Sequence, residues 1–243
     1  MRLEQIWRYP VKSMGGETLS SADLDPGGIA GDRRVAVVDP AARRPEHPVT
    51  ARELPQLLRF SARWEAGEAV ISGPGLAPTS HRDPAAAAAV ADVVGRRVEL
   101  VDRAEGEFDD SPLHAVHLLW VRELEAELGA PVDPRRFRAT LYLDGVGGEP
   151  EADWVGRLLD VGPAVLEVVD LCRRCALTTR DPSAPGRAWP QLLRHLVGQR
   201  AEVLGVYLRT AVPGEVAVGA EVELGRGPGG GAHSWPGATR RLR

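Results

Sequence analysis

The stretch AVLEVVDLCRRCALTT, residues 164–179, combines the two features that decide how this chain is interpreted. Residues 164–169 are mostly apolar and rich in valine, which predicts a short strand. Residues 170–179 then set two cysteines three positions apart, with two arginines between them. Adjacent cations lower the pKa of a thiol and favour the thiolate, the form that attacks or binds soft metals. The stretch therefore predicts a strand that leads into a reactive or metal-binding loop.

Short apolar segments separated by Gly, Pro and Asp recur along the rest of the chain. Further strands are expected at residues 3–9, 35–38, 69–72, 98–101, 139–143, 158–161, 205–210 and 221–224. Helices are expected at 83–94, from Ser111-Pro112 to a glycine stop at Gly129, and at 189–196. Strands and helices do not alternate as they do in a parallel sheet. The chain is therefore expected to be mainly β with a few helices (α+β), built on barrels or sandwiches.

The length of 243 residues favours two lobes over one. We place the boundary near residue 105, which gives a first lobe at 1–105 and a second at 106–225. Residues 226–243 are rich in glycine, have a basic end and contain few aliphatic side chains, so a disordered tail is expected there.

Composition restricts the class of protein. A formal net charge of -4 argues against a nucleic-acid partner, because such proteins normally present a basic face to the phosphates. Only 2 cysteines are present, which excludes a disulfide-framed secreted scaffold. The sequence shows no signal peptide and no apolar run long enough to span a membrane, so a cytoplasmic protein with no membrane contact is expected.

Cations gather at a few places in the sequence. Among the 30 basic residues Lys12 is the sole lysine, and a compact ammonium suits a tight anion pocket better than the wide guanidinium fork of arginine does. Arginines cluster at 33–34 and 135–138, and Ser13 and Ser111 can add single hydrogen bonds to a phosphate. Each cluster taken alone is more often a solvated face or an ion pair. Their occurrence together with a thiol loop favours an anionic ligand.

The two cysteines, Cys172 and Cys175, admit other interpretations. Tetrahedral zinc is disfavoured, because the chain lacks a second cysteine pair and has no pair of histidines at ligand spacing. A thioredoxin-like redox pair is disfavoured by the lack of a βαβ setting. A further alternative is that Cys172 and Cys175 are simply two small residues buried in a strand.

Five ordered motifs resemble the MOSC superfamily. The motifs are Tyr9-Pro10-Val11-Lys12-Ser13, Gly31-Asp32-Arg33, Arg136-Phe137-Arg138 with the stretch 151–157 around Trp154, the loop 174–182, and Gly205-Val206-Tyr207 with residues 214–219. The resemblance implies a MOSC-type β-barrel preceded by an N-terminal β-barrel-like lobe. The superfamily includes the mitochondrial amidoxime-reducing component, bacterial reductases of N-hydroxylated compounds and the C-terminal domain of molybdenum cofactor sulfurase.

The resemblance also implies a cofactor and its ligands. Cys175 would ligate the metal of a molybdenum cofactor (Mo-molybdopterin). The residues implied to surround the pterin and its phosphate are Lys12, Ser13, Arg33, Ser111, Arg138, Thr140 and Arg174. The implied reaction is the reduction of small N-oxygenated substrates, with the metal providing the redox chemistry. Because the chain has no four-cysteine set for an iron–sulfur domain, the electrons would come from a separate protein.

The chain departs from the family pattern at several positions. Ala139-Thr140 stand where the family commonly has Pro-Asn, and His117 and Trp120 stand where serines are common. Cys172 is interpreted as a packing neighbour or a resolving thiol. Two alternative functions follow from the same residues: a sulfur carrier that uses a persulfide on Cys175, and a cofactor-binding module without turnover.

Overall fold

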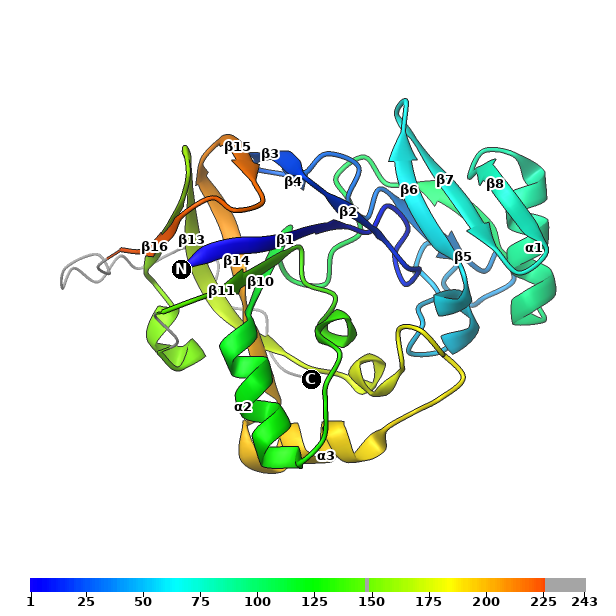
Figure 1. Ribbon diagram of the computed structural model, residues 1–243. Coiled ribbons are helices and arrows are strands. Elements are labelled where there is room, and N and C mark those ends of the chain that lie inside the picture. Colours follow the sequence, from blue (N-terminus) through cyan, green and yellow to red (C-terminus); the bar gives the residue numbers. More distant parts are fainter. Residues whose placement is uncertain (147–148, 226–243) are drawn as a thin grey trace.

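The structure, a computed structural model, describes residues 1–146 and 149–225 (Figure 1). The expected tail at 226–243 lies outside the described residues. The strands are β1 (Arg2–Arg8), β2 (Glu17–Leu19), β3 (Ser21–Asp25), β4 (Gly28–Ile29), β5 (Val35–Val38), β6 (Ser61–Glu65), β7 (Glu68–Gly73), β8 (Leu76–Ser80), β9 (Glu99–Asp102), β10 (Leu113–His117), β11 (Leu141–Asp144), β12 (Leu158–Val161), β13 (Ala164–Arg173), β14 (Val203–Val212), β15 (Gly214–Ala217) and β16 (Val222–Leu224). The α-helices are α1 (Pro84–Val94), α2 (Leu118–Leu128) and α3 (Pro190–Gln199), and the 3-10 helices are η1 (Pro55–Arg59), η2 (Pro134–Phe137), η3 (Glu151–Trp154) and η4 (Ala176–Thr179).

The largest sheet has the strand order β16-β12-β13-β14-β10-β11-β1-β2. The sheet closes on itself beside the end strand β2, because Arg2 at the start of β1 forms a bridge with Glu221 beside β16. The amide of Leu3 donates to the carbonyl of Ala220 at 3.0 Å, and the amide of Val222 donates to the carbonyl of Met1 at 2.9 Å. The sheet therefore closes into a barrel, which leaves few unpaired strand edges.

Apolar side chains from every wall fill this barrel. Its fully buried members include Leu3, Leu113, Leu166 and Val206. Trp120 of α2 and Trp154 of η3 belong to the same cluster, with ring centroids 4.8 Å apart. Buried aromatic rings contribute large apolar areas, so this pair is expected to carry much of the stability of the barrel.

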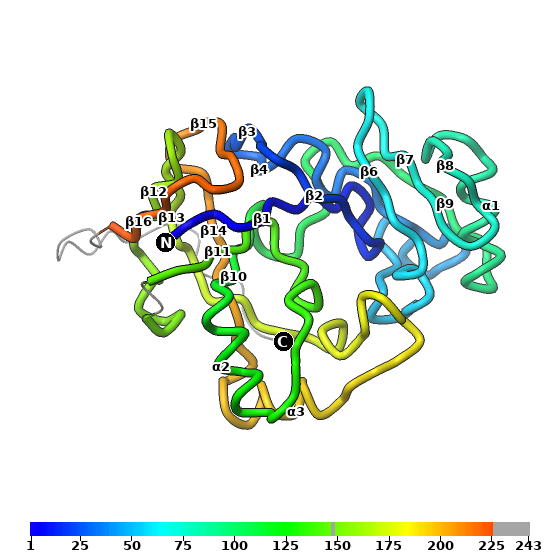
Figure 2. The backbone as a smooth tube through the Cα atoms, viewed as in Figure 1, coloured from blue at the N-terminus to red at the C-terminus, as the bar shows by residue number. Residues whose placement is uncertain are grey.

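Residues 35–102 hold most of a second core. β5 pairs with β9, and β6, β7 and β8 form a three-stranded sheet against which α1 lies (Figure 2). The buried cluster between them includes Val35, Phe60, Ile71 and Val90. Strand pairing also crosses residue 105, because β1 pairs with β11 and β3 pairs with β15. The division at residue 105 stays a prediction.

Local sequence explains where α1 begins and ends. The carboxylate of Asp83 accepts a hydrogen bond from the amide of Ala85 at 2.9 Å, and Pro84 takes the first helical position. Gly95 ends the helix in the left-handed conformation with φ 75°. Ncap aspartate, first-turn proline and terminal glycine are the residues that these positions favour, so the expectation of a helix at 83–94 is confirmed.

The helix expected to begin at Ser111-Pro112 is wrong before Leu118. Residues 113–117 form β10, a fully buried strand between β11 and β14, and the helix begins only at Leu118. Because β10 is buried on both faces, its sequence does not show the alternation of polar and apolar residues that marks a half-exposed strand. His117 then caps α2, because its Nδ1 accepts from the amide of Leu119 at 3.0 Å.

The expected fold class, mainly β with a few helices, is confirmed. The strands expected at 35–38 and 158–161 have those bounds in the structure, whereas the strand expected at 139–143 is observed at Leu141–Asp144. No helix in the described part of the chain is long and apolar enough to cross a membrane.

Candidate functional site

Cys175 lies in the short turn between the end of β13 and the start of η4. Its side chain is partly exposed, whereas that of Cys172, within β13, is buried with 3% exposure. The two thiols therefore differ in access although they are only three residues apart. The arginine between β13 and Cys175, Arg174, is held by its amide, which donates to the carbonyl of Glu202 at 2.7 Å.

Cys175 opens onto a cavity that we call the Cys175 cavity. Residues from both halves of the chain line it. Seven of the eight residues predicted from sequence lie in this lining: Lys12, Ser13, Arg33, Ser111, Arg138, Arg174 and Cys175. The other lining residues are Thr50, Arg52, Asp109, Asp110, Pro112, His114, Arg136, Phe137, Cys172, Arg173, Leu177, Thr178 and Tyr207. Residues far apart in the sequence thus converge on one thiol.

Three of the lining residues have a strained backbone. Ser13, Arg33 and Arg138 have φ values of 73°, 52° and 53°. Residues other than glycine seldom adopt such values, which cost about 1–3 kcal/mol each and persist where the surroundings impose them. Strain of this kind concentrates at binding and catalytic sites, so its occurrence here supports a ligand-binding role for the cavity.

A chain of polar contacts connects Lys12 to the thiol. Asp109 accepts from Lys12 Nζ at 2.8 Å and from Arg52 Nη2 at 2.7 Å, and Arg52 Nε donates to Cys175 Sγ at 3.3 Å. Lys12 Nζ also donates to the carbonyl of Glu107 at 2.9 Å. Burial raises the pKa of Asp109, but Lys12 and Arg52 outweigh it and hold that pKa below its ordinary value. The carboxylate is therefore charged, and it pairs with Lys12 and Arg52 as a bound anion would.

Arg33 and Arg138 stack on Tyr9. Their guanidinium carbons lie 5.1 Å and 4.3 Å from the centre of its ring. Arg138 Nη2 donates to the carbonyl of Met14 at 2.7 Å, and Arg33 is ion-paired with buried Asp32. Because carbonyls and a ring hold the planes of these guanidinium groups, their charges face the cavity with little freedom left to lose on binding.

Arg174 is oriented from three sides. It donates to the carbonyl of Phe137 at 2.6 Å, to the sulfur of Cys172, and to His114 Nε2 at 3.2 Å. Burial, followed by the charges of Arg174 and Arg33, lowers the pKa of His114 well below its ordinary value. His114 is therefore neutral and accepts from Arg174 at Nε2. Arg174 Nε is buried without a hydrogen-bond partner among the described residues.

Thr140 is the predicted site residue that the structure does not bring to the cavity. Its side chain is fully buried, and its hydroxyl accepts from the amide of His114 and donates to the carbonyl of His114, both at 2.9 Å. The only donor of the hydroxyl is used by the backbone, and the side chain has no exposed surface through which a ligand could reach it. The predicted contact of Thr140 with a cofactor therefore has no support in this geometry.

His117 and Trp120 also lie away from the Cys175 cavity. Both are buried beside Trp154, with the ring centroids of His117 and Trp120 5.7 Å apart. The departures from the family pattern at these two positions therefore alter the barrel core, not the lining of the cavity.

Sequence reasoning missed three residues of the site: Arg52, Asp109 and His114. Arg52 lies between η1 and β5, in a segment with no motif. Asp109 stands beside Ser111 within a run of acidic residues that resembles an ordinary linker. His114 was assigned to a helix, where its side chain could not be placed on the strand face that it occupies. The hydrophobic residues on either side of His114 were the available signal for a strand.

Comparisons with known proteins agree with the fold. The model of the MOSC domain matches residues 97–223, more than half of the chain, and the model of the MOSC N-terminal beta barrel domain matches residues 1–110. The crystal structure of YUAD protein from Bacillus subtilis is 15% identical, with a TM-score of 0.51, over 92% of this chain and 94% of that one. That likeness shows the fold alone.

Two YiiM structures match a smaller part. YiiM from Geobacillus stearothermophilus is 22% identical over 48% of this chain and 55% of that one, with a TM-score of 0.37. YiiM from Escherichia coli is 23% identical over 49% and 57%, with a TM-score of 0.33. Among curated proteins, no match was found.

The match of the domain model to most of the second half of the chain, together with the closed barrel, identifies the family. The chain belongs to the MOSC domain family, a superfamily of molybdenum-cofactor-binding domains.

Proposed function

We propose that the chain binds the molybdenum cofactor in the Cys175 cavity and reduces small N-oxygenated compounds there. The observation that carries the proposal is the partly exposed thiol of Cys175 at a cavity whose cations come from both halves of the chain. The neighbouring thiol of Cys172 also lies at this cavity, but it is buried and its sulfur accepts from Arg174, so Cys175 is the more accessible of the two. A thiol at the mouth of a cationic cavity is suited to a soft metal that belongs to an anionic cofactor.

The donor set fits the charge of such a cofactor. Phosphate and dithiolene groups are anionic, and Lys12, Arg33, Arg138 and Arg174 supply fixed positive charge around one cavity. The buried Nε atoms of Arg136 and Arg174 have no hydrogen-bond partner among the described residues, although buried polar groups normally have one. A bound ligand with several acceptors would satisfy them.

The residues of this chain divide the binding task. Lys12 and Ser13 stand at the cavity beside Arg33, and together they form the proposed phosphate contact. Asp109 pairs with Lys12 and Arg52, and the phosphate would take the place of its carboxylate. Arg52 Nε donates to Cys175 Sγ at 3.3 Å and so places a positive charge beside the sulfur that would be the ligand of the metal.

Two neutral side chains complete the lining. His114 is uncharged because burial lowers its pKa, and burial together with Cys172 raises the pKa of Tyr207 above its ordinary value. Both groups therefore add hydrogen-bonding capacity without adding charge, and Tyr207 keeps its proton. When bound, the cofactor would supply two-electron reduction and oxygen-atom removal. The protein supplies the sulfur ligand, the counter-charge and the shape of the cavity.

Electrons are proposed to come from a separate protein. The chain contains no cysteines beyond Cys172 and Cys175, so it has no ligand set for an iron–sulfur cluster of its own.

The test is metal content and turnover in protein made in a molybdate-supplied host. The native chain is expected to contain nearly one molybdenum per molecule and to reduce benzamidoxime when reduced methyl viologen supplies electrons. Cys175→Ala should abolish turnover. Cys172→Ala is the comparison variant, because it removes a second thiol of the lining but leaves the proposed metal ligand in place, and it should lower turnover less than Cys175→Ala does. Equal turnover by native protein and Cys175→Ala would contradict the proposal.

The same preparation distinguishes the alternatives. Protein without molybdenum that releases sulfide on reduction would support sulfur transfer through a persulfide on Cys175. Protein loaded with molybdenum but inert toward every N-oxygenated substrate would support a binding module.

Lys12 provides a second test that does not depend on turnover. Lys12→Ala is expected to lower molybdenum content about tenfold, since a charge-assisted hydrogen bond contributes about 1.5–3 kcal/mol, while the melting temperature of cofactor-free protein changes little. Lys12→Arg keeps the charge but not the compact ammonium, so it should restore only part of the content. An unchanged content with a lowered melting temperature would make Lys12 a structural residue.

A further inference from the structure

A second pocket lies on the other side of the wall of the Cys175 cavity. We call it the Trp7 pocket. It lies among the end of β1, η1, η2 and the segment after η4, and its apolar side is formed by Trp7, Leu58, Leu177 and Pro182. Arg136, Arg138 and Leu177 line both this pocket and the Cys175 cavity. The two sites are therefore neighbours that share a wall of three side chains.

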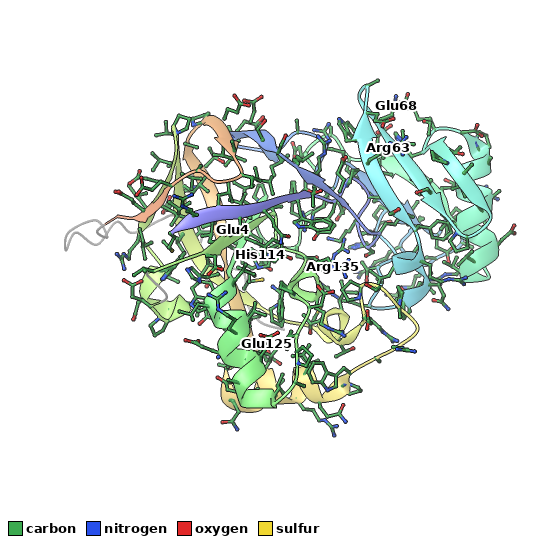
Figure 3. All side chains as sticks on the ribbon, in the orientation of Figure 1. Glu4, Arg63, Glu68, His114, Glu125 and Arg135 are labelled. Atoms are coloured by element: carbon green, nitrogen blue, oxygen red, sulfur yellow. The ribbon has the colours of Figure 1, made fainter. Side chains whose placement is uncertain are left out.

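The Trp7 pocket carries a strong excess of positive charge. Its lining, which lies wholly within the described residues, contains no aspartate or glutamate and five arginines: Arg59, Arg135, Arg136, Arg138 and Arg180. Figure 3 labels Arg135, which lies on η2 near the centre of the view. The whole chain has a net charge of -4, so a pocket lining whose charged residues are all positive differs from the chain as a whole.

Some of these arginines are neutralised from outside the pocket and others are not. Asp133 pairs with Arg135 at 2.6 Å, and Asp181 lies 3.6 Å from Arg136, whose Nη1 is taken by backbone carbonyls. The side chains of Arg59 and Arg180 form no ion pair or hydrogen bond with the described part of the chain. Two guanidinium groups therefore remain available for an anion.

The apolar side of the pocket is suited to a flat ring. Trp7 is partly exposed, and its orientation is held by a hydrogen bond from Nε1 to Gln5 at 2.8 Å and by stacking on Tyr9, with centroids 5.9 Å apart. An indole held in this way loses little freedom when a second ring packs against it. Arginine planes also stack on aromatic rings, as Arg138 does on Tyr9.

We propose that the Trp7 pocket is a second ligand site, which binds a planar aromatic compound bearing a carboxylate or a phosphate. The ring packs against Trp7 and the apolar side chains opposite it. The anionic group is bound by Arg180 and Arg59, because bidentate guanidinium contacts recognise both kinds of oxyanion. Since Arg136 and Arg138 belong to both linings, occupancy of this site alters the Cys175 cavity.

The site is tested by calorimetric titration of the full chain with four probes. Adenosine 5′-monophosphate carries ring and phosphate, 2-naphthoate carries ring and carboxylate, adenosine carries the ring alone, and ribose 5-phosphate carries the phosphate alone. At least one of the first two is expected to bind at least about tenfold more tightly than the last two. The stronger of the two identifies the oxyanion. Absence of binding by both, or equal binding of ribose 5-phosphate, would overturn the proposal.

Variants locate the binding. Arg180→Ala is expected to weaken the better probe about tenfold and the more exposed Arg59→Ala about threefold. Arg97→Ala, which removes an exposed arginine paired with Glu99 outside the lining, is the matched control and should have no effect. Loss of affinity in the control equal to that in Arg180→Ala would mean non-specific attraction.

A last comparison separates the two cavities. In cofactor-free protein, Lys12→Ala, which alters only the Cys175 cavity, should leave probe binding unchanged. Cofactor-loaded native protein should still bind the probe, with an altered affinity. If cofactor loading or Lys12→Ala abolishes probe binding, the Trp7 pocket belongs to the cofactor site and the proposal fails.

Discussion

His114 and His117 occupy the same buried strand, β10, but face opposite environments. Neighbours alternate along a strand, so Leu113, Ala115 and His117 point into the barrel core while His114 and Val116 point to the outer face. Burial lowers the pKa of both histidines, with two arginines adding to the effect at His114. One strand therefore serves two purposes, since its inner face stabilises the barrel and its outer face supports the Cys175 cavity.

The largest effect is expected on the inner face. Trp154→Ala removes a fully buried indole that packs against Trp120 and His117, and such truncations cost about 3–5 kcal/mol. Urea denaturation should show this loss in the free energy of unfolding, while the molybdenum content per folded molecule stays unchanged. Trp154→Phe, which keeps an aromatic ring, should lose less. A loss below about 1 kcal/mol for Trp154→Ala would contradict the conclusion that this face stabilises the barrel.

The outer face is tested at His114. His114→Leu removes one of the acceptors of Arg174, and a hydrogen bond to a charged group contributes about 1.5–3 kcal/mol, so retention of molybdenum should fall about tenfold. His114→Gln supplies an amide oxygen in a similar place and should retain most of the metal. Dialysis followed by elemental analysis measures the difference. Equal retention by both variants would show that Arg174 does not need this acceptor.

Acid stability distinguishes the two faces further. Because burial lowers the folded pKa of His117 below its unfolded value of about 6.5, the unfolded chain binds the proton more readily. The stability that neutral His117 contributes is complete above about pH 6.5 and is lost as the pH falls from there toward the folded pKa, by up to about 1.4 kcal/mol per pH unit. Asp144 opposes the shift and Arg122 adds to it, and these two side chains pair with each other at 2.6 Å.

His117→Asn keeps a side chain that can cap α2 and removes the titration. Melting temperatures measured from pH 7.5 to 5 should fall less steeply in this variant than in the native chain. Parallel curves would show that His117 does not cause the acid sensitivity, and the outer-face histidine would become the candidate.

The smallest effect is expected at the surface, where neither face of β10 is involved. Hydrogen bonds from Arg200 and His195 lower the pKa of Glu127 to about 2, and these contacts join α2 to α3. Glu127→Gln should cost about 0.5–1 kcal/mol at neutral pH. Because the folded pKa is depressed, this contribution is present above the unfolded pKa near 4.5 and disappears as the pH falls toward 2. Chemical denaturation at pH 7 and pH 3 measures both values.

Local chemistry made part of the fold predictable. Asp83, Pro84 and Gly95 mark the ends of α1 in the sequence, and β5 and β12 could be recognised as short apolar runs. β10 could not be recognised, because a strand buried on both faces resembles a buried helix and only its neighbours in the sheet distinguish them.

The site was predictable where a motif existed. Seven of eight predicted residues line the Cys175 cavity, but their roles as ligands remain predictions. Arg52 was not predictable, since its contact with Cys175 joins positions 123 residues apart. The position of Thr140 depends on its hydroxyl bonding the backbone of a neighbouring strand, which a sequence does not reveal.

The way the barrel closes has a consequence for synthesis of the protein. β2 follows β1 closely in the chain, but the other partners of β1, namely β11 and the residues beside β16, follow it only after about 140 and 220 residues. The core within residues 35–102 is made from closer segments and can assemble while translation continues. The first half of β1 must therefore wait for partners that are made much later, whereas its second half can pair with β2 at once, so the first half is the segment most in need of chaperone protection in the nascent chain.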